Sequence, residues 1–210
     1  RENKHLILAG FGANVCWIVL QKVDVLMLGM FRPLAETGHY TVALTLIDAM
    51  VMLPGAIAAV LMPRLARELH VQERTQLLLV TLAAVMAVFG VTCVGMALVG
   101  PWLVPMLFGS EFEATVPVFQ RLLVAAWLMG GYAVCQQAVQ GYGRVRYQFV
   151  APLTGLVVKA GLGWMLISHG MMAAANATIA GYAVALGVAL GLALWGHVPA
   201  TRANGVDTLA

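Results

Sequence analysis

Five charged residues stand inside long apolar stretches of this 210-residue chain: Lys22, Asp24, Asp48, Arg121 and Lys159. Placing a charge at the centre of a bilayer costs at least about 2.5–3.5 kcal/mol on insertion scales. Each charge must therefore be offset by an opposite charge, by water or by a ligand. Charges inside a membrane pair with one another or line the path of a substrate or an ion. These five residues are the first candidates for a functional site.

The composition of the chain indicates a membrane protein. Hydrophobic residues make up 61% of the sequence and charged residues 10%, against about a half and about a quarter in a soluble domain. The net charge of +3 is small and gives no reason to expect a nucleic acid partner. The chain starts at Arg1 without a signal-peptide pattern and soon enters an apolar run. We interpret it as a piece of a longer polypeptide.

Six stretches have the roughly 20 mainly apolar residues that a membrane span needs. They cover residues 6–31, 39–62, 77–99, 115–140, 148–168 and 171–198. We therefore expect an all-α membrane protein in which a six-transmembrane-helix bundle occupies residues 1–198, followed by a cytoplasmic tail at 199–210. The stretch 101–114 contains Pro101 and Pro105 and predicts an interfacial loop with Trp102 and Phe108 at headgroup level.

Lys and Arg in the connections are distributed very unequally between the two sides of the membrane. One side has eight: Arg1, Lys4, Arg64, Arg67, Arg74, Arg144, Arg146 and Arg202. The other side has Arg32 alone. Because cytoplasmic connections are enriched in Lys and Arg, we expect a multi-pass protein of the inner (cytoplasmic) cell membrane, with both ends of this segment in the cytoplasm.

Helical periodicity places the polar residues of four expected helices on defined faces. The first helix has a polar arc made of Asn14, Gln21, Lys22 and Asp24. The second has a stripe of Thr41, Thr45 and Asp48, and the fourth a sector with Arg121, Tyr132 and Gln136. The fifth has one face with Gln148, Pro152, Gly155, Lys159 and Gly163. We expect these four helices to surround a hydrated cavity, with the third and sixth helices as scaffold.

The charged residues allow more than one interpretation. Asp24, Asp48 and Arg121 lie roughly 9–13 Å from the outer surface, so either acid paired with Arg121 could form a structural ion pair. Lys22 could extend towards lipid headgroups. Lys159 lies near mid-membrane with a glycine one turn to either side. These small neighbours leave room for water or a ligand group, or else allow another helix to approach closely.

Enzyme and metal-site patterns are absent from the sequence. The three cysteines lie in apolar runs without CxxC spacing, and we interpret them as small buried residues. The five histidines lie near span ends at spacings that predict no metal site. No HExxH, GxSxG or P-loop occurs. We therefore expect no catalytic residue, no metal and no cofactor.

Two segments resemble the polysaccharide flippases, which export lipid-linked O-antigen and exopolysaccharide units. In Val23–Ala66, an Asp near a helix end is followed by "LG-F", a short loop, "G-Y-VA" and a helix ending "LP-AI----MP-LA". The second segment is "LFGSEFEA", Leu107–Ala114, which resembles the family's "fG--f--A" entry to a helix. These flippases belong to the multidrug/oligosaccharidyl-lipid/polysaccharide exporter superfamily.

The resemblance implies 12 to 14 helices in two lobes, of which this chain would be the C-terminal one. Such proteins bind an undecaprenyl-pyrophosphate-linked sugar in a central, often cationic cavity and move it outward by alternating access, for surface polysaccharide biosynthesis. The implied partners are the lipid-linked oligosaccharide, membrane lipids, the N-terminal lobe of the same polypeptide and other polysaccharide assembly proteins.

The resemblance and the positions of the polar residues together give a candidate site. The expected substrate-binding residues are Lys22, Arg121, Lys159, Gln21, Asn14 and Tyr132. Three cations against two carboxylates leave the interior net positive, which suits a pyrophosphate or an acidic sugar. Asp24 matches the family's motif position, and we expect Asp24 and Asp48 to act in coupling or gating, with H⁺ or Na⁺ as a possible coupling ion.

Two other functions remain open at this stage. A cation-coupled multidrug exporter of the same superfamily would hold cationic drugs with acidic residues, but here the buried cations outnumber the acids. A membrane-embedded glycan-handling enzyme would need an aspartyl pair such as Asp24 and Asp48, and neither lies in a GxGD-like context.

Overall fold

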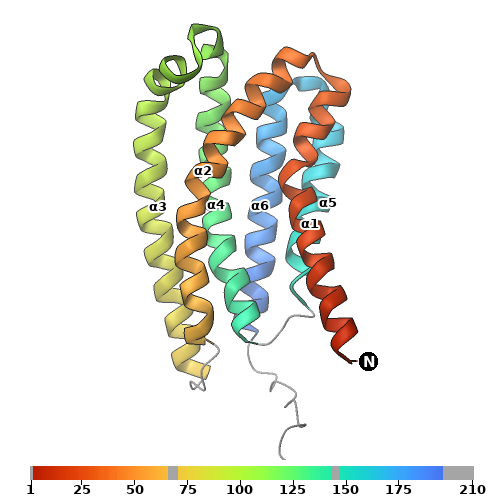
Figure 1. Cartoon of the computed structure of the whole chain (residues 1–210), viewed down its shortest axis with the longest axis vertical. Coiled ribbons are helices and arrows are strands. Elements are labelled where there is room, and N and C mark those ends of the chain that lie inside the picture. The colour runs from red at the N-terminus through yellow and green to blue at the C-terminus, as the bar shows by residue number, and fades with distance from the viewer. Residues whose placement is uncertain (1, 66–70, 143–146, 196–210) are drawn as a thin grey trace, which may run out of the picture.

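The computed structural model describes residues 2–65, 71–142 and 147–195, and every regular element among them is a helix (Figure 1). The elements in chain order are α1 (Glu2–Phe31), α2 (Leu34–Leu65), α3 (Val71–Phe108), η1 (Ser110–Thr115), α4 (Val116–Gly141), α5 (Val150–Leu166), η3 (Ile167–His169) and α6 (Met171–Leu194). The described part of the chain is therefore an all-α bundle, as its apolar periodicity predicts.

Each of the six predicted spans corresponds to one of the α-helices. Five of these helices, α1, α2, α3, α4 and α6, are long and apolar enough to cross a bilayer. Helix α5 has 17 residues, or about 25 Å at 1.5 Å per residue, which is near the lower limit for a span. Five candidate spans are thus present, and the crossing by α5 stays a prediction.

The predicted loop at 101–114 is wrong over its first part. Helix α3 continues through Pro101 and Pro105 to Phe108. Proline lacks one backbone donor, and neighbouring helices in a membrane bundle can compensate for that loss. The next residue, Gly109, has a φ of 99° and donates its N–H to the carbonyl of Pro105 at 2.9 Å. The chain then makes the short η1 turn before α4.

Helices α4 and α6 form the middle of the bundle. Helices α2 and α3 pack against α4, α5 packs against α6, and α1 lies along α5. In the apolar window of α4, 67% of residues are buried, against 17% in α1. The main core has buried residues from α1, α2, α3, α4 and α6, among them Leu20, Tyr40, Phe89 and Phe119.

Helices α1 and α2 make few contacts with each other, although they are consecutive in the chain. They meet at the end where Arg32 joins them and diverge towards the other end (Figure 1). The Arg32 guanidinium donates to both carboxylate oxygens of Glu36, at 2.7 and 3.0 Å, and to the carbonyl of Ser168 at 3.4 Å. The two helices therefore form a V whose closed end is tied to the α5–α6 connection.

The orientation of the bundle in the membrane stays a prediction. The expected tail at 199–210 lies outside the described residues, and so do five of the cations that indicate the cytoplasmic side: Arg1, Arg67, Arg144, Arg146 and Arg202.

Candidate functional site

A buried ion pair joins α1 to α5. The ammonium of Lys159 lies 2.9 Å from Oδ2 of Asp24, and the two side chains are 1% and 4% exposed. The same ammonium donates to the backbone carbonyl of Leu20 at 2.8 Å and lies 5.5 Å from the centre of the Tyr182 ring. Lys159 is thus fully engaged by protein groups in this conformation.

The carboxylate of Asp24 has further hydrogen-bond partners. The Tyr40 hydroxyl donates to Oδ2 at 2.6 Å, and the Thr178 hydroxyl lies 3.0 Å from the same oxygen. The backbone N–H of Val25 donates to Oδ1 at 3.0 Å. A buried ion pair needs hydrogen-bond partners for its remaining donors and acceptors, and these contacts supply them. Because the partners come from different helices, the network fixes α1, α2, α5 and α6 to one another.

The glycines near Lys159 serve close helix packing. A methyl group on Gly181 of α6 would lie 2.7 Å from Cβ of Lys159 and 3.0 Å from the carbonyl oxygen of Gly155. Pro152, Gly155, Lys159 and Gly163 all lie on the buried face of α5, which agrees with the predicted face. Of the two interpretations that the sequence left open, the structure shows close approach of another helix at Gly155 rather than space for a ligand.

The other three charges lie in more exposed pairs. Lys22 of α1 donates to Oδ2 of Asp48 on α2 at 2.8 Å, and these side chains are 48% and 43% exposed. Arg121 of α4 donates to the amide oxygen of Asn176 on α6 at 2.7 Å. The structure does not form the possible ion pair of Arg121 with Asp24 or Asp48, because each acid is paired with a lysine instead.

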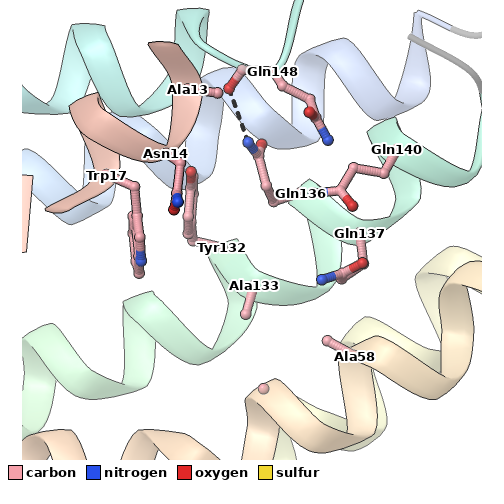
Figure 2. A pocket seen from close by; sticks show the side chains of 11 residues that line it. Ala13, Asn14, Trp17, Ala58, Tyr132, Ala133, Gln136, Gln137, Gln140 and Gln148 are labelled. Atoms are coloured by element: carbon pink, nitrogen blue, oxygen red, sulfur yellow. Dashed lines mark hydrogen bonds between the residues drawn. The ribbon is translucent and has the colours of Figure 1, made fainter. Parts of the chain in front are cut away.

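A polar hollow of about 460 Å³ lies between the diverging parts of α1 and α2, with α4 as its floor (Figure 2). Its lining residues are Ala13, Asn14, Trp17, Gly55, Ala58, Tyr132, Ala133, Gln136, Gln137, Gln140 and Gln148. Five of these eleven side chains are carboxamides, two are aromatic and none is charged. From the Lys22–Asp48 pair, the hollow lies towards the open end of the V.

Two contacts shape the walls of the hollow. The rings of Trp17 and Tyr132 stack with their centres 5.0 Å apart and an angle of 12° between the planes. The side-chain amide of Gln136 donates to the backbone carbonyl of Gln148 at 2.8 Å, shown as the dashed line in Figure 2. The hollow therefore combines an aromatic wall with several amide groups that can both donate and accept hydrogen bonds.

The structure separates the predicted site residues into groups. Asn14 and Tyr132 line the hollow, whereas Lys22, Arg121, Lys159, Gln21, Asp24 and Asp48 are not among its lining residues. The hollow is therefore uncharged, and the expected cationic cavity stays a prediction.

Several lining residues did not enter the predicted site. They are Trp17, Gln136, Gln137, Gln140 and Gln148. The spacing of Tyr132, Gln136 and Gln140 at i, i+4 and i+8 on one helix is the signal that could have identified Gln136 and Gln140. In the part of the chain that the structure describes, no three His, Cys, Asp or Glu side chains lie close enough to hold a metal ion.

A family model described as "Polysaccharide biosynthesis protein" matches residues 5–117, which is more than half of the chain. The match runs from α1 to the start of α4 and includes Lys22, Asp24 and Asp48. No curated protein and no solved structure matches the chain. The resemblance to polysaccharide exporters is supported by this match, and the chain belongs to the polysaccharide biosynthesis protein family.

Proposed function

We propose that this chain is one lobe of a membrane transporter that moves a polyprenyl-pyrophosphate-linked oligosaccharide across the cytoplasmic membrane by alternating access. Membership of the polysaccharide biosynthesis family supports a polysaccharide-related transporter. The observation that supports the proposal most strongly is the polar hollow inside an otherwise apolar bundle. Polar groups in the core of a membrane protein face a substrate path or a hydrated cavity.

The contacts of the bundle support a specific way of opening. Helix α1 is fixed to α5 by the buried pair of Asp24 and Lys159, whereas α2 packs mainly on α4. The contact between α1 and α2 is small and includes the exposed Lys22–Asp48 pair. We propose that this pair faces a water-filled opening, where an ion pair contributes only about 0–1 kcal/mol. The buried hydrogen bond from Tyr40 of α2 to Asp24 of α1 holds the closed end of this boundary. We propose that the bundle opens and closes along the rest of the boundary, from the Lys22–Asp48 pair to the open end of the V, with Asp48 as the gating residue.

Lys22 has two tasks in this proposal. Its side chain is half-exposed, five residues along α1 from Trp17 of the hollow. We propose that it exchanges the carboxylate of Asp48 for a phosphate oxygen when the substrate arrives. Contacts of Arg121 and Lys159 with the substrate stay predictions, and for Lys159 such a contact would require the Asp24 pair to break. Coupling to H⁺ or Na⁺ through Asp24 also stays a prediction.

The proposal is tested in a deletion strain, with and without the full-length protein supplied again. We expect the deletion to abolish surface polysaccharide and to accumulate lipid-linked oligosaccharide in the inner membrane, with restoration by the wild type. Intact surface polysaccharide in the deletion strain would refute the proposal.

A charge-exchange experiment then tests whether Lys22 acts through its pair with Asp48 or through contact with a phosphate. The variants are Lys22→Asp, Asp48→Lys and the double exchange, each with its abundance measured beside transport. We expect both single variants to lose transport at normal abundance. If the double exchange restores transport, the pair acts as a gate and the position of the cation is unimportant. If it does not, Lys22 is needed where it stands, which supports the phosphate contact.

The multidrug exporter is less compatible with this lining. A site for cationic drugs needs carboxylates, and the hollow has none among its described lining residues. Drug sensitivity of the deletion strain, with surface polysaccharide unchanged, would favour that function instead.

A further inference from the structure

We infer that the hollow binds an uncharged sugar ring of the substrate and excludes its charged groups. The inference rests on the proposed function and specifies which part of the substrate this site takes. It also differs from the sequence-based expectation that one cationic cavity holds pyrophosphate or acidic sugars.

The chemistry of the lining suits a neutral sugar. A carboxamide has an oxygen that accepts hydrogen bonds and an NH₂ group that donates two of them. Adjacent sugar hydroxyls likewise donate and accept, so a carboxamide can bond to two of them at once. Asn14 lies on α1, and Gln137 and Gln140 project from α4 across the same space (Figure 2). The Trp17 and Tyr132 rings stack on each other and Tyr132 is 3% exposed, so the partly exposed Trp17 supplies the apolar surface against which a pyranose can pack.

The size of the hollow agrees with this occupant. Its volume of about 460 Å³ is within the range of roughly 300–1,000 Å³ for small-molecule sites. Four small residues, Ala13, Gly55, Ala58 and Ala133, leave the centre of the hollow free of bulky side chains. The site therefore has room for a sugar with its hydroxyls and some water.

Charge decides between a neutral and an acidic sugar. None of the described lining residues is a cation. Moving a carboxylate or a phosphate from water into an uncharged site is unfavourable unless an opposite charge compensates it. The three cations inside the predicted spans are engaged elsewhere: Lys159 with Asp24, Lys22 with Asp48 and Arg121 with Asn176. A neutral ring is thus the part of the substrate that this hollow accepts.

The test measures binding to the full-length protein in nanodiscs with three probes. These are sugar-free polyprenyl pyrophosphate, polyprenyl-pyrophosphate-linked N-acetylglucosamine, and polyprenyl-pyrophosphate-linked glucuronic acid. We expect the N-acetylglucosamine lipid to bind about 10-fold more tightly than the sugar-free lipid, because the sugar adds one or two hydrogen bonds. The glucuronic acid lipid should gain no such advantage.

Two variants test whether the preference for the N-acetylglucosamine lipid arises in the hollow. Gln137→Ala and Gln140→Ala should each weaken binding of the N-acetylglucosamine lipid about 3- to 10-fold and leave the sugar-free lipid unchanged. The matched control is Gln120→Ala, since Gln120 is also a glutamine of α4 but lies outside the hollow and bonds to the carbonyl of Ala97. This control should bind all three probes as the wild type does.

The outcomes separate this inference from the proposed function. If all three lipids bind but the glucuronic acid lipid binds most tightly, or if the two variants bind as the wild type does, the inference is wrong and the transporter proposal survives. If none of the lipids binds, and the deletion strain keeps its surface polysaccharide, the proposed function fails as well.

Discussion

Replacing Lys159 by Met tests whether the buried pair is a structural tie. The change removes an ammonium that is 1% exposed and leaves the carboxylate of Asp24 without its counter-charge. It also removes the donor to the carbonyl of Leu20. Breaking a buried pair by removing one partner costs about 3–5 kcal/mol. For a chain of this length we expect the melting temperature to fall by roughly 6–20 °C.

The assay is thermal unfolding of the full-length protein in detergent, followed by fluorescence-detected size-exclusion chromatography. Asp24→Asn should destabilise the protein similarly, because it leaves the lysine unpaired. The double variant, Asp24→Asn with Lys159→Met, should melt above either single variant, since no unpaired charge remains; we expect a coupling of about 2 kcal/mol. Lys22→Met is the matched control and should shift stability by less than about 1 kcal/mol, because its pair is half-exposed.

One result would refute this reasoning. If Lys159→Met melts like the wild type but abolishes transport at normal abundance, the lysine acts on the substrate rather than on the fold.

Three further predictions concern stability in the same assay. Gly181→Ala should lower the free energy of unfolding by about 1–3 kcal/mol, because its methyl group would lie 2.7 Å from Cβ of Lys159. Gly187→Ala on the same helix has open space around it, so it should leave the free energy of unfolding unchanged or raise it by up to about 1 kcal/mol. Equal melting temperatures for the two variants would contradict the close packing of α5 on α6. Tyr40→Phe should cost about 1.5–3 kcal/mol, since it removes a 2.6 Å hydrogen bond to a buried carboxylate, and an unchanged melting temperature would show that this bond is unimportant. Asp48→Asn should cost less than about 1 kcal/mol, and a larger loss would mean that the exposed pair holds the bundle together.

Helical periodicity predicted the faces of single helices well. The spacing of Pro152, Gly155, Lys159 and Gly163 places them on one side of α5, and the structure buries all four. Periodicity could not predict the partner of Lys159, because it says nothing about which helices are neighbours. The pairing with Asp24 follows from α1 lying along α5, which is a tertiary property.

Periodicity placed Asn14, Tyr132, Gln136 and Gln148 of the hollow on polar faces, but the position and shape of the hollow could not be predicted from the sequence. It exists because α1 and α2 diverge from their connection, and no local residue pattern specifies that angle. Gln137 and Gln140 lie more than four turns from Arg121, which is the one charged residue of α4. The prolines at 101 and 105 indicated a loop, yet α3 continues through both of them.

Labelling of a cysteine inside the hollow tests the central claim most directly. Ala133 lines the hollow, so Ala133→Cys can be placed in full-length protein whose native cysteines are replaced. The probe is a membrane-impermeant maleimide applied to inside-out vesicles, and Ser110→Cys in the exposed η1 turn serves as the control for the opposite side. We predict that the cysteine at 133 reacts from the cytoplasmic side and is protected when lipid-linked oligosaccharide accumulates in the membrane. Labelling that the oligosaccharide leaves unchanged would contradict a substrate site in this hollow.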